Sequence, residues 1–123
     1  MEEKLKELQD MNFKVAHLGI NSSDEEEALS AAKFFMTLFG FPMNDKKDSV
    51  FAGPMIEIMK GNGRGTKGHI AISVKNIHKG KKYLEDMGYV FDADSAKYDS
   101  NGNLVLIYLK DEVIGFAVHL IQE

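Results

Sequence analysis

Four residues of this 123-residue chain have the side-chain types of a divalent metal site: His17, Glu57, His69 and His119. The chain has four histidines and no cysteine, so disulfides, thiolate metal sites and cysteine nucleophiles are excluded. Three imidazoles and one carboxylate match the ligand preference of first-row ions such as Zn, Ni, Co, Mn or Fe. A lone histidine in a strand is more often an ordinary hydrogen-bonded residue than a ligand. The hypothesis therefore depends on elements that bring the four together.

Each of the four residues lies in a segment with the period-two pattern of a strand. In VAHLGIN, Leu18 and Ile20 point to one face and His17 to the other. The same alternation holds in MIEIM, GHIAISV and GFAVHLIQ, which contain Glu57, His69 and His119. Because the branched apolar faces must pack against helices, we expect the four polar side chains to converge on the helix-free face. Small neighbours leave volume for a pocket there: Gly19, Ala71, Ser73 and Ala117.

The chain contains an internal repeat that places these strands in equivalent positions. AHLGI corresponds to GHIAI, LFGF to DMGY, and MIEIM to FAVHL. Each half predicts a strand, a helix and then several antiparallel strands, a unit whose half-buried sheet face needs a partner. We therefore predict an α+β fold in which units 13–60 and 68–122 form one domain, 13–123. Four candidate ligands in equivalent strands of a repeat favour a metal site over four unrelated surface residues.

The helices that cover this sheet have recognisable ends. Ser22, Ser23 and Asp24 offer caps for a helix that runs from Glu25 to about Phe39 and ends at Gly40. A second helix follows a cap at Asn76 and ends before Gly88, and residues 1–12 are either an amphipathic helix or a linker remnant. The expected inward side chains are Ala28, Ala31, Ala32, Phe35, Leu38 and Phe39 in the first helix, and Ile77, Tyr83, Leu84 and Met87 in the second. We also expect Phe34 and Phe41 in the core. The expected strands are 13–21, 49–52, 55–59, 69–74, 89–91, 96–98, 104–109 and 116–121.

Charge and hydropathy limit the partners. Fifteen basic against 19 acidic residues give a net charge of −4, which argues against nucleic acid and anionic membranes. The sequence has no apolar run of about 18 residues and no apolar stretch of the signal-peptide type at its start, so we expect a soluble cytoplasmic protein. The partner that we expect is a small-molecule substrate.

The segment 60–68, KGNGRGTKG, reads as a flexible connector between the two units. It is not a P-loop, because it precedes a strand and does not open a helix. Its Arg64 is a candidate for contacting an anionic substrate group, as are Lys97 and Tyr98 on a later strand. His78 is expected on the surface.

With VAHLGIN, MIEIM, GHIAISV and GFAVHLIQ in these positions, residues 14–122 resemble the vicinal oxygen chelate superfamily, which includes glyoxalase I, fosfomycin-resistance proteins, extradiol dioxygenases and bleomycin-resistance proteins. The resemblance implies two βαβββ units that form a cupped mixed sheet with helices outside, and His17, Glu57, His69 and His119 as metal ligands. Glyoxalase I has a glutamate at the position of His119 that serves as ligand and base. Since a metal-bound neutral imidazole has no lone pair left for a proton, His119 is either a ligand or an unbound base.

A narrower resemblance rests on the segments FFMTLFGF, FAGPMIEIMKG, GHIAISV, SAKYDSNGN and GFAVHLIQ. These runs are similar to the glyoxalase-like domains attached to bacterial 2-keto-4-hydroxyglutarate and 2-keto-3-deoxy-6-phosphogluconate aldolases. The aldolase barrel itself needs roughly 200 residues or more, so its chemistry does not fit in this chain.

Two hypotheses follow from these resemblances. The first is a divalent-metal-dependent lyase or isomerase that chelates two oxygens of a small metabolite, with His119 and Glu57 as candidate catalytic residues. The alternative is a non-catalytic metal- or metabolite-binding domain associated with such an aldolase. The glycine-rich connector permits closure within one chain as well as a homodimer with swapped units.

Overall fold

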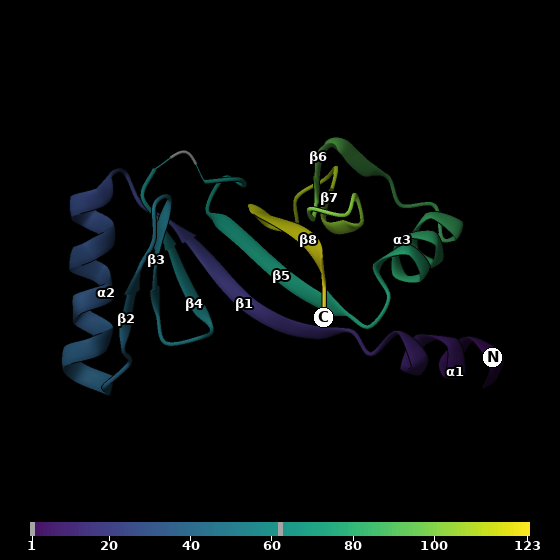
Figure 1. Ribbon diagram of the computed structural model, residues 1–123, viewed down its shortest axis with the longest axis horizontal. Helices are drawn as coiled ribbons and strands as arrows, with labels where there is room; N and C mark the ends of the chain where they lie inside the picture. The colour runs from purple at the N-terminus through teal and green to yellow at the C-terminus, as the bar shows by residue number, and fades with distance from the viewer. Residues whose placement is uncertain (1, 62) are drawn as a thin grey trace.

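The computed structural model describes residues 2–61 and 63–123, and its strands form a single eight-stranded sheet (Figure 1). The elements are α1 (Glu2–Met11), β1 (Lys14–Asn21), α2 (Glu25–Phe39), β2 (Met43–Asp45), β3 (Ser49–Ala52), β4 (Ile56–Met59), β5 (Gly68–Val74), α3 (Ile77–Asp86), β6 (Phe91–Tyr98), β7 (Leu104–Leu109) and β8 (Phe116–Gln122). The strand order is β2-β3-β4-β1-β5-β8-β7-β6.

The predicted repeat is present as two βαβββ units, β1 to β4 with α2 and β5 to β8 with α3. In each unit the first and last strands are parallel neighbours, β1 with β4 and β5 with β8. The antiparallel ladder between β1 and β5 joins the units into one curved sheet. The predicted fold class, α+β with a cupped mixed sheet and outer helices, is therefore confirmed.

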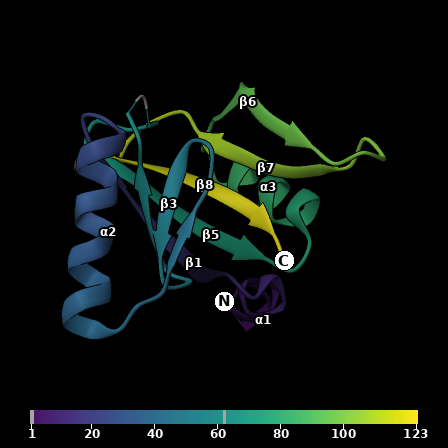
Figure 2. The same ribbon diagram turned by 60° about the vertical axis from the view of Figure 1, so that its left-hand side comes forward.

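Each helix covers the apolar face of its own unit, as Figures 1 and 2 show for α2 at one end and α3 at the other. The α2 core consists of Ala28, Ala32, Val50, Ala52 and Ile58. The α3 core consists of Met11, Val74, Ile77, Leu104, Ile107 and Leu120. Val50, Ile58, Val74, Ile107 and Leu120 thus pack under the helices, and the opposite face of the sheet carries polar groups. Leu18 of β1, expected to pack in the same way, is 36% exposed and lies outside both cores.

Helix α2 has the predicted ends. The Asp24 carboxylate accepts a hydrogen bond from the backbone N–H of Glu27 (2.8 Å), and Gly40 ends the helix in the left-handed region at φ 73°. The segment predicted as an amphipathic helix or a linker remnant forms α1, and its Met11 packs into the α3 core.

The prediction that Leu38, Phe39, Phe34 and Phe41 are core residues is wrong. Leu38 and Phe39 are each 59% exposed, and Phe34 is 52% exposed. Fifteen helical residues span about 22 Å, whereas the three- and four-residue strands β2, β3 and β4 span about 13 Å or less. The last turns of α2 therefore extend past the sheet, and the aromatic rings pack on one another at centroid distances of 5.3–6.4 Å, mostly edge to face or tilted.

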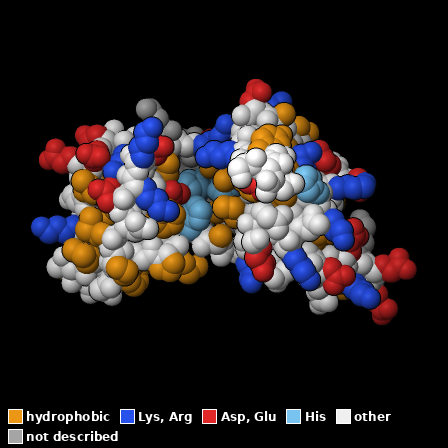
Figure 3. All heavy atoms as spheres, in the orientation of Figure 1, with side chains coloured by type: hydrophobic (Ala, Val, Ile, Leu, Met, Phe, Trp, Pro, Cys, Tyr) orange, Lys and Arg blue, Asp and Glu red, His pale blue; other side chains and the backbone are white. Residues whose placement is uncertain are grey.

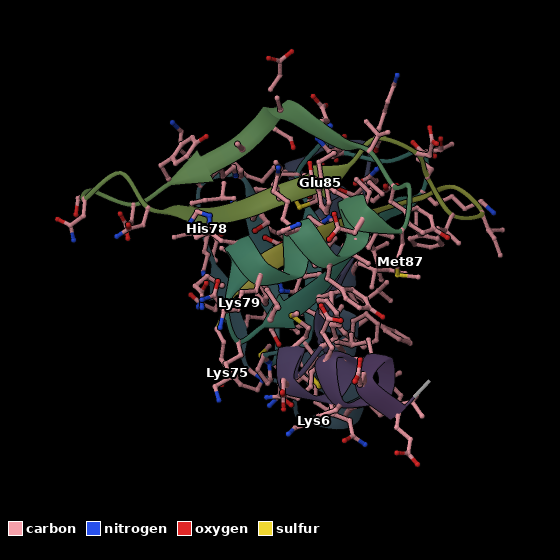
Figure 4. The ribbon with its side chains drawn as sticks, turned by 90° about the vertical axis from the view of Figure 1, so that its right-hand side faces the viewer. Lys6, Lys75, His78, Lys79, Glu85 and Met87 are labelled. Carbon is pink, nitrogen blue, oxygen red and sulfur yellow. The ribbon has the colours of Figure 1, made fainter. Side chains whose placement is uncertain are left out.

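The second unit brings smaller corrections. Met87, expected inward, is 50% exposed because α3 ends at Asp86 and Met87 is its cap. Instead of the two strands expected at 89–91 and 96–98, the unit has one bulged strand, β6, from Phe91 to Tyr98. In the first unit, the short β2 was not predicted. His78 is exposed as predicted, and Figure 4 shows it with Lys79 and Met87 on the outer side of the molecule.

Among the helices of the described residues, none has the length and apolarity to cross a membrane.

Candidate metal centre

The four predicted ligands lie on the four central strands of the sheet, β4, β1, β5 and β8. The strand registers explain how they meet. Gly19 pairs with Glu57 on one side and with His69 on the other, and Ala71 pairs with both His17 and His119. Because residues directly opposite each other share a face, all four side chains project from the helix-free face. Each unit contributes two of the candidate ligands, and in this structure all four come from one chain.

Three donor atoms of the set lie at the spacing expected for ligands of one ion. His17 Nε2 is 3.2 Å from His69 Nε2, and Glu57 Oε1 is 3.3 Å from His17 Nε2 and 3.1 Å from His69 Nε2. Ligands about 2.0–2.1 Å from a metal are about 2.8–3.0 Å apart in octahedral geometry and about 3.3–3.4 Å apart in tetrahedral geometry. The spacing of these three atoms is therefore compatible with a shared divalent ion.

His119 completes a cluster of three imidazoles. One ring nitrogen from each of His17, His69 and His119 lies within 4.8 Å of the others. His119 Nδ1 lies 3.1 Å from the carbonyl oxygen of Leu120, which can only accept, so Nδ1 carries the hydrogen and Nε2 keeps its lone pair. The side chain is almost completely buried, and this burial lowers the pKa of His119 from 6.5 to about 4. The imidazole is therefore neutral at physiological pH, as a metal ligand or a base must be.

Glu57 is held in its ionised form. Burial by itself raises the pKa of the Glu57 carboxyl, but hydrogen bonds with His17, His69 and Ser49 outweigh burial and hold the pKa far below its ordinary value. The Ser49 hydroxyl donates to Glu57 Oε2 at 2.7 Å and is itself buried. Sequence analysis missed Ser49, although it lies on the same period-two face of β3 as Phe51, whose direct partner across the ladder is Glu57.

Gly19 leaves the space that the His69 ring occupies. A Cβ at position 19 would lie 2.0 Å from His69 Cε1, so any side chain there would displace the ring. His69 is 3% exposed, and its Nδ1 has no hydrogen-bond partner among the described residues. The sequence indicated Gly19 only as a small neighbour. The structure shows that the absence of a side chain at this position determines where His69 lies.

Tyr108 and Arg64 extend the site toward β7 and the connector. Tyr108 pairs with His119 in the sheet, and the two ring centroids are 4.7 Å apart. Burial raises the pKa of Tyr108 to about 12, so the phenol keeps its proton. The Arg64 guanidinium lies over the Tyr108 ring at 4.7 Å. Sequence analysis missed Tyr108 because LVLIYL lacks a polar alternation.

Of the three residues expected to contact an anionic substrate group, only Arg64 is shown next to this cluster. Tyr98 is 62% exposed at the end of the edge strand β6, and Lys97 is exposed beside it. The side-chain contacts found among the described residues place neither of them against the histidines.

The site opens on the bare face of the sheet. Figure 3 shows histidine surface in the hollow between the two halves of the molecule, with Lys and Arg side chains above it. An apolar cavity of about 170 Å³ lies behind the sheet, lined by residues such as Phe13 and Leu84, and reaches His119 from the α3 side. A larger cavity of about 420 Å³ between α1 and α3 has surface charges of both signs around it. Of the four predicted ligands, His119 lines the smaller cavity and none lines the larger one.

Comparisons with known proteins identify the fold. No protein-family model and no curated protein sequence matches the chain. Among solved structures, a hypothetical protein, BH1468, from Bacillus halodurans C-125 is similar with a TM-score of 0.62 and 19% identity, over 90% of this chain and 94% of that one. A methylmalonyl-CoA epimerase in complex with methylmalonyl-CoA and NH4+ gives 0.61 and 16%, over 89% and 94%. The epimerase from Mycobacterium tuberculosis gives 0.60 and 14%, over 88% and 86%. The chain thus has the glyoxalase-like α+β fold that these structures share, with its histidine cluster on the helix-free side of the sheet.

Proposed function

We propose that the protein is a divalent-metal-dependent, glyoxalase-like enzyme of the isomerase type that acts on a small oxygenated metabolite. The observation that carries this proposal is the close approach of His17 Nε2, His69 Nε2 and Glu57 Oε1, at 3.1–3.3 Å from one another. The fold neighbours add support, because several of them are methylmalonyl-CoA epimerases, and an epimerase moves a proton at one carbon.

The residues of the site divide into ligands and a proton acceptor. His17, Glu57 and His69 would hold the ion, with His119 as a fourth ligand or as a base beside it. When bound, a divalent metal would supply a Lewis acid that chelates two neighbouring substrate oxygens and stabilises the negative charge that develops there.

Glu57 is better suited to hold the ion than to accept a proton. One of its oxygens faces two imidazoles and the other accepts a hydrogen bond from Ser49, so the carboxylate is fully engaged. His119 presents a neutral ring whose Nδ1 is held by the Leu120 carbonyl, which leaves Nε2 as a proton acceptor. If Nε2 is not occupied by the ion, His119 is therefore the base.

Metal binding is the first test. The purified protein is stripped with a chelator, and its affinity for Zn, Co, Ni and Mn is measured by calorimetry. We expect binding tighter than micromolar, and a loss of about 100-fold in His69→Ala. His78→Ala removes an exposed histidine of α3 and is the matched control, which should bind like the wild type. Absence of binding, or equal affinity in the two variants, would overturn the metal site.

The reaction class is tested by proton exchange. The loaded protein is incubated in D2O with methylmalonyl-CoA, with the hemithioacetal of methylglyoxal and glutathione, and with 2-oxo acids, and deuterium incorporation is followed by NMR. Exchange that requires the metal and disappears in His119→Gln supports an isomerase with His119 as base. Thermal stabilisation by a compound without any exchange would favour the alternative, a non-catalytic metabolite-binding domain.

A further inference from the structure

The connector between the units is fastened beside the metal centre. The side-chain amide of Asn21, two residues after Gly19 on the same face of β1, donates to the carbonyl of Gly65 at 2.8 Å. The backbone N–H of Lys67 donates to Gly115 (2.8 Å), and Thr66 donates to Glu112 (2.8 Å). The connector, expected to be flexible, is therefore held by three hydrogen bonds. They involve the three residues that follow Arg64 in the sequence.

These hydrogen bonds place Arg64 over the wall of the site. Its guanidinium lies 4.7 Å above the ring of Tyr108, and that ring lies 4.7 Å from the imidazole of His119. The guanidinium carbon therefore lies no more than about 9.4 Å from the centre of the His119 ring, a separation that an extended metabolite chelated beside His119 can span. A ligand with two oxygens at the histidine cluster therefore reaches the guanidinium with its other end.

The charge around Arg64 selects the kind of group it can bind. Among the described residues, its hydrogen-bond partner is Asp92, at 3.0 Å from Nη1. A guanidinium has five N–H donors in a planar fork that matches a carboxylate. Since Asp92 already supplies one negative charge, the pair has little positive charge left to balance a phosphate dianion, whereas a monoanionic carboxylate fits the planar fork and needs less compensation.

We propose that Arg64 is a specificity-determining residue that binds a carboxylate of the substrate while the histidine cluster holds two of its other oxygens. The proposal rests on the proposed function for its second anchor point, the metal. It narrows the substrate to a small oxygenated metabolite with a carboxylate remote from the chelating oxygens. Arg64 acts on binding and takes no part in the proton transfer.

The test uses two ligands of equal chain length. 2-Oxoglutarate and 2-oxopentanoate both offer a carboxylate and a neighbouring keto oxygen to the metal, but only the former has a second carboxylate. We expect calorimetry on the Zn-loaded wild type to show about 10- to 100-fold tighter binding of 2-oxoglutarate. In Arg64→Ala the two ligands should bind with about equal affinity, and the affinity for Zn should be unchanged. Arg64→Lys should keep a part of it, because the charge remains but the fork is lost.

Lys67→Gln is the matched control, since it removes one positive charge from the same connector. It should keep the preference for 2-oxoglutarate, and Asp92→Asn should increase it a few-fold by releasing the guanidinium. An unchanged preference in Arg64→Ala, or equal losses in Arg64→Ala and Lys67→Gln, would overturn the proposal. Because Zn affinity is measured separately, a failure of the metal site itself is distinguished from a failure of Arg64.

Discussion

At the scale of single residues, the candidate ligands are positioned by neighbours that offer no donor atom to the site. Ser49 holds one oxygen of Glu57, the Leu120 carbonyl fixes the tautomer of His119, and Gly19 leaves room for His69. Such outer contacts set the orientation and the charge of the ligands, and their loss commonly weakens metal affinity by 10- to 100-fold. The chemistry of the site therefore depends on residues that a search for ligand types does not find.

Gly19→Ala tests this dependence. A Cβ only 2.0 Å from His69 Cε1 forces the ring away, and we expect metal affinity to fall by about 10- to 100-fold. Gly80→Ala is the control, because its Cβ would meet Val74 Cγ2 at 2.8 Å in the α3 core, away from the histidines. Both variants should lose stability, but only the first should lose metal. Equal calorimetric affinities would show that His69 tolerates the displacement.

The buried His119 should make the metal-free protein sensitive to mild acid. Its pKa is about 4 in the folded chain against 6.5 without burial, so the unfolded chain binds the proton more readily. Stability is thus fully present above pH 6.5 and is lost as the pH falls toward 4, by about 3 kcal/mol in total. Urea unfolding of the chelator-treated protein at pH 7, 6, 5 and 4 measures the slope. His119→Gln should flatten it, and an equally steep slope in that variant would assign the effect to other groups.

At the scale of elements, helix α2 shows what periodicity does and does not predict. The sequence predicts both of its ends, because Asp24 and Gly40 are local signals, and it predicts the inward face of Ala28, Ala32 and Phe35. It does not predict that Phe39 is exposed, because this depends on the length of the strands beneath the helix. A helical pattern identifies a face but says nothing about where the opposing sheet ends.

Two phenylalanines of α2 should therefore differ in their effect on stability. Phe35 packs on the core of Ala28, Val50 and Ile58, and Phe35→Ala should cost about 2–3 kcal/mol. Phe39 lies beyond the sheet, and Phe39→Ala should cost less than about 1 kcal/mol. Urea unfolding of the two variants measures the contrast, and equal losses would mean that the ring stack at the end of the helix contributes as much as the core.

At the scale of the whole molecule, the repeat explains why the convergence of the four side chains could be predicted and why their surroundings could not. His17, Glu57, His69 and His119 lie in the first and last strand of each unit, so the period-two pattern and the repeat together place them on one face. The roles of Ser49, Tyr108 and Arg64 depend on which strands become neighbours and in which register. Those relations are long-range and leave no local signal in the sequence.

The division of ligands between the units predicts how metal binding affects folding. His17 and Glu57 belong to the first unit and His69 and His119 to the second, and between the units the sheet is continuous through the β1–β5 ladder. An ion held by both halves stabilises only the conformation in which the halves are joined, by about 4 kcal/mol at a free metal concentration 1,000 times the Kd. We expect Zn to raise the urea midpoint of the wild type and of His78→Ala fully, and to stabilise His69→Ala by only about 1.4 kcal/mol, because a 100-fold weaker site is then filled at only 10 times its Kd. A shift of equal size in His69→Ala would mean that the stabilising ion binds elsewhere in the chain.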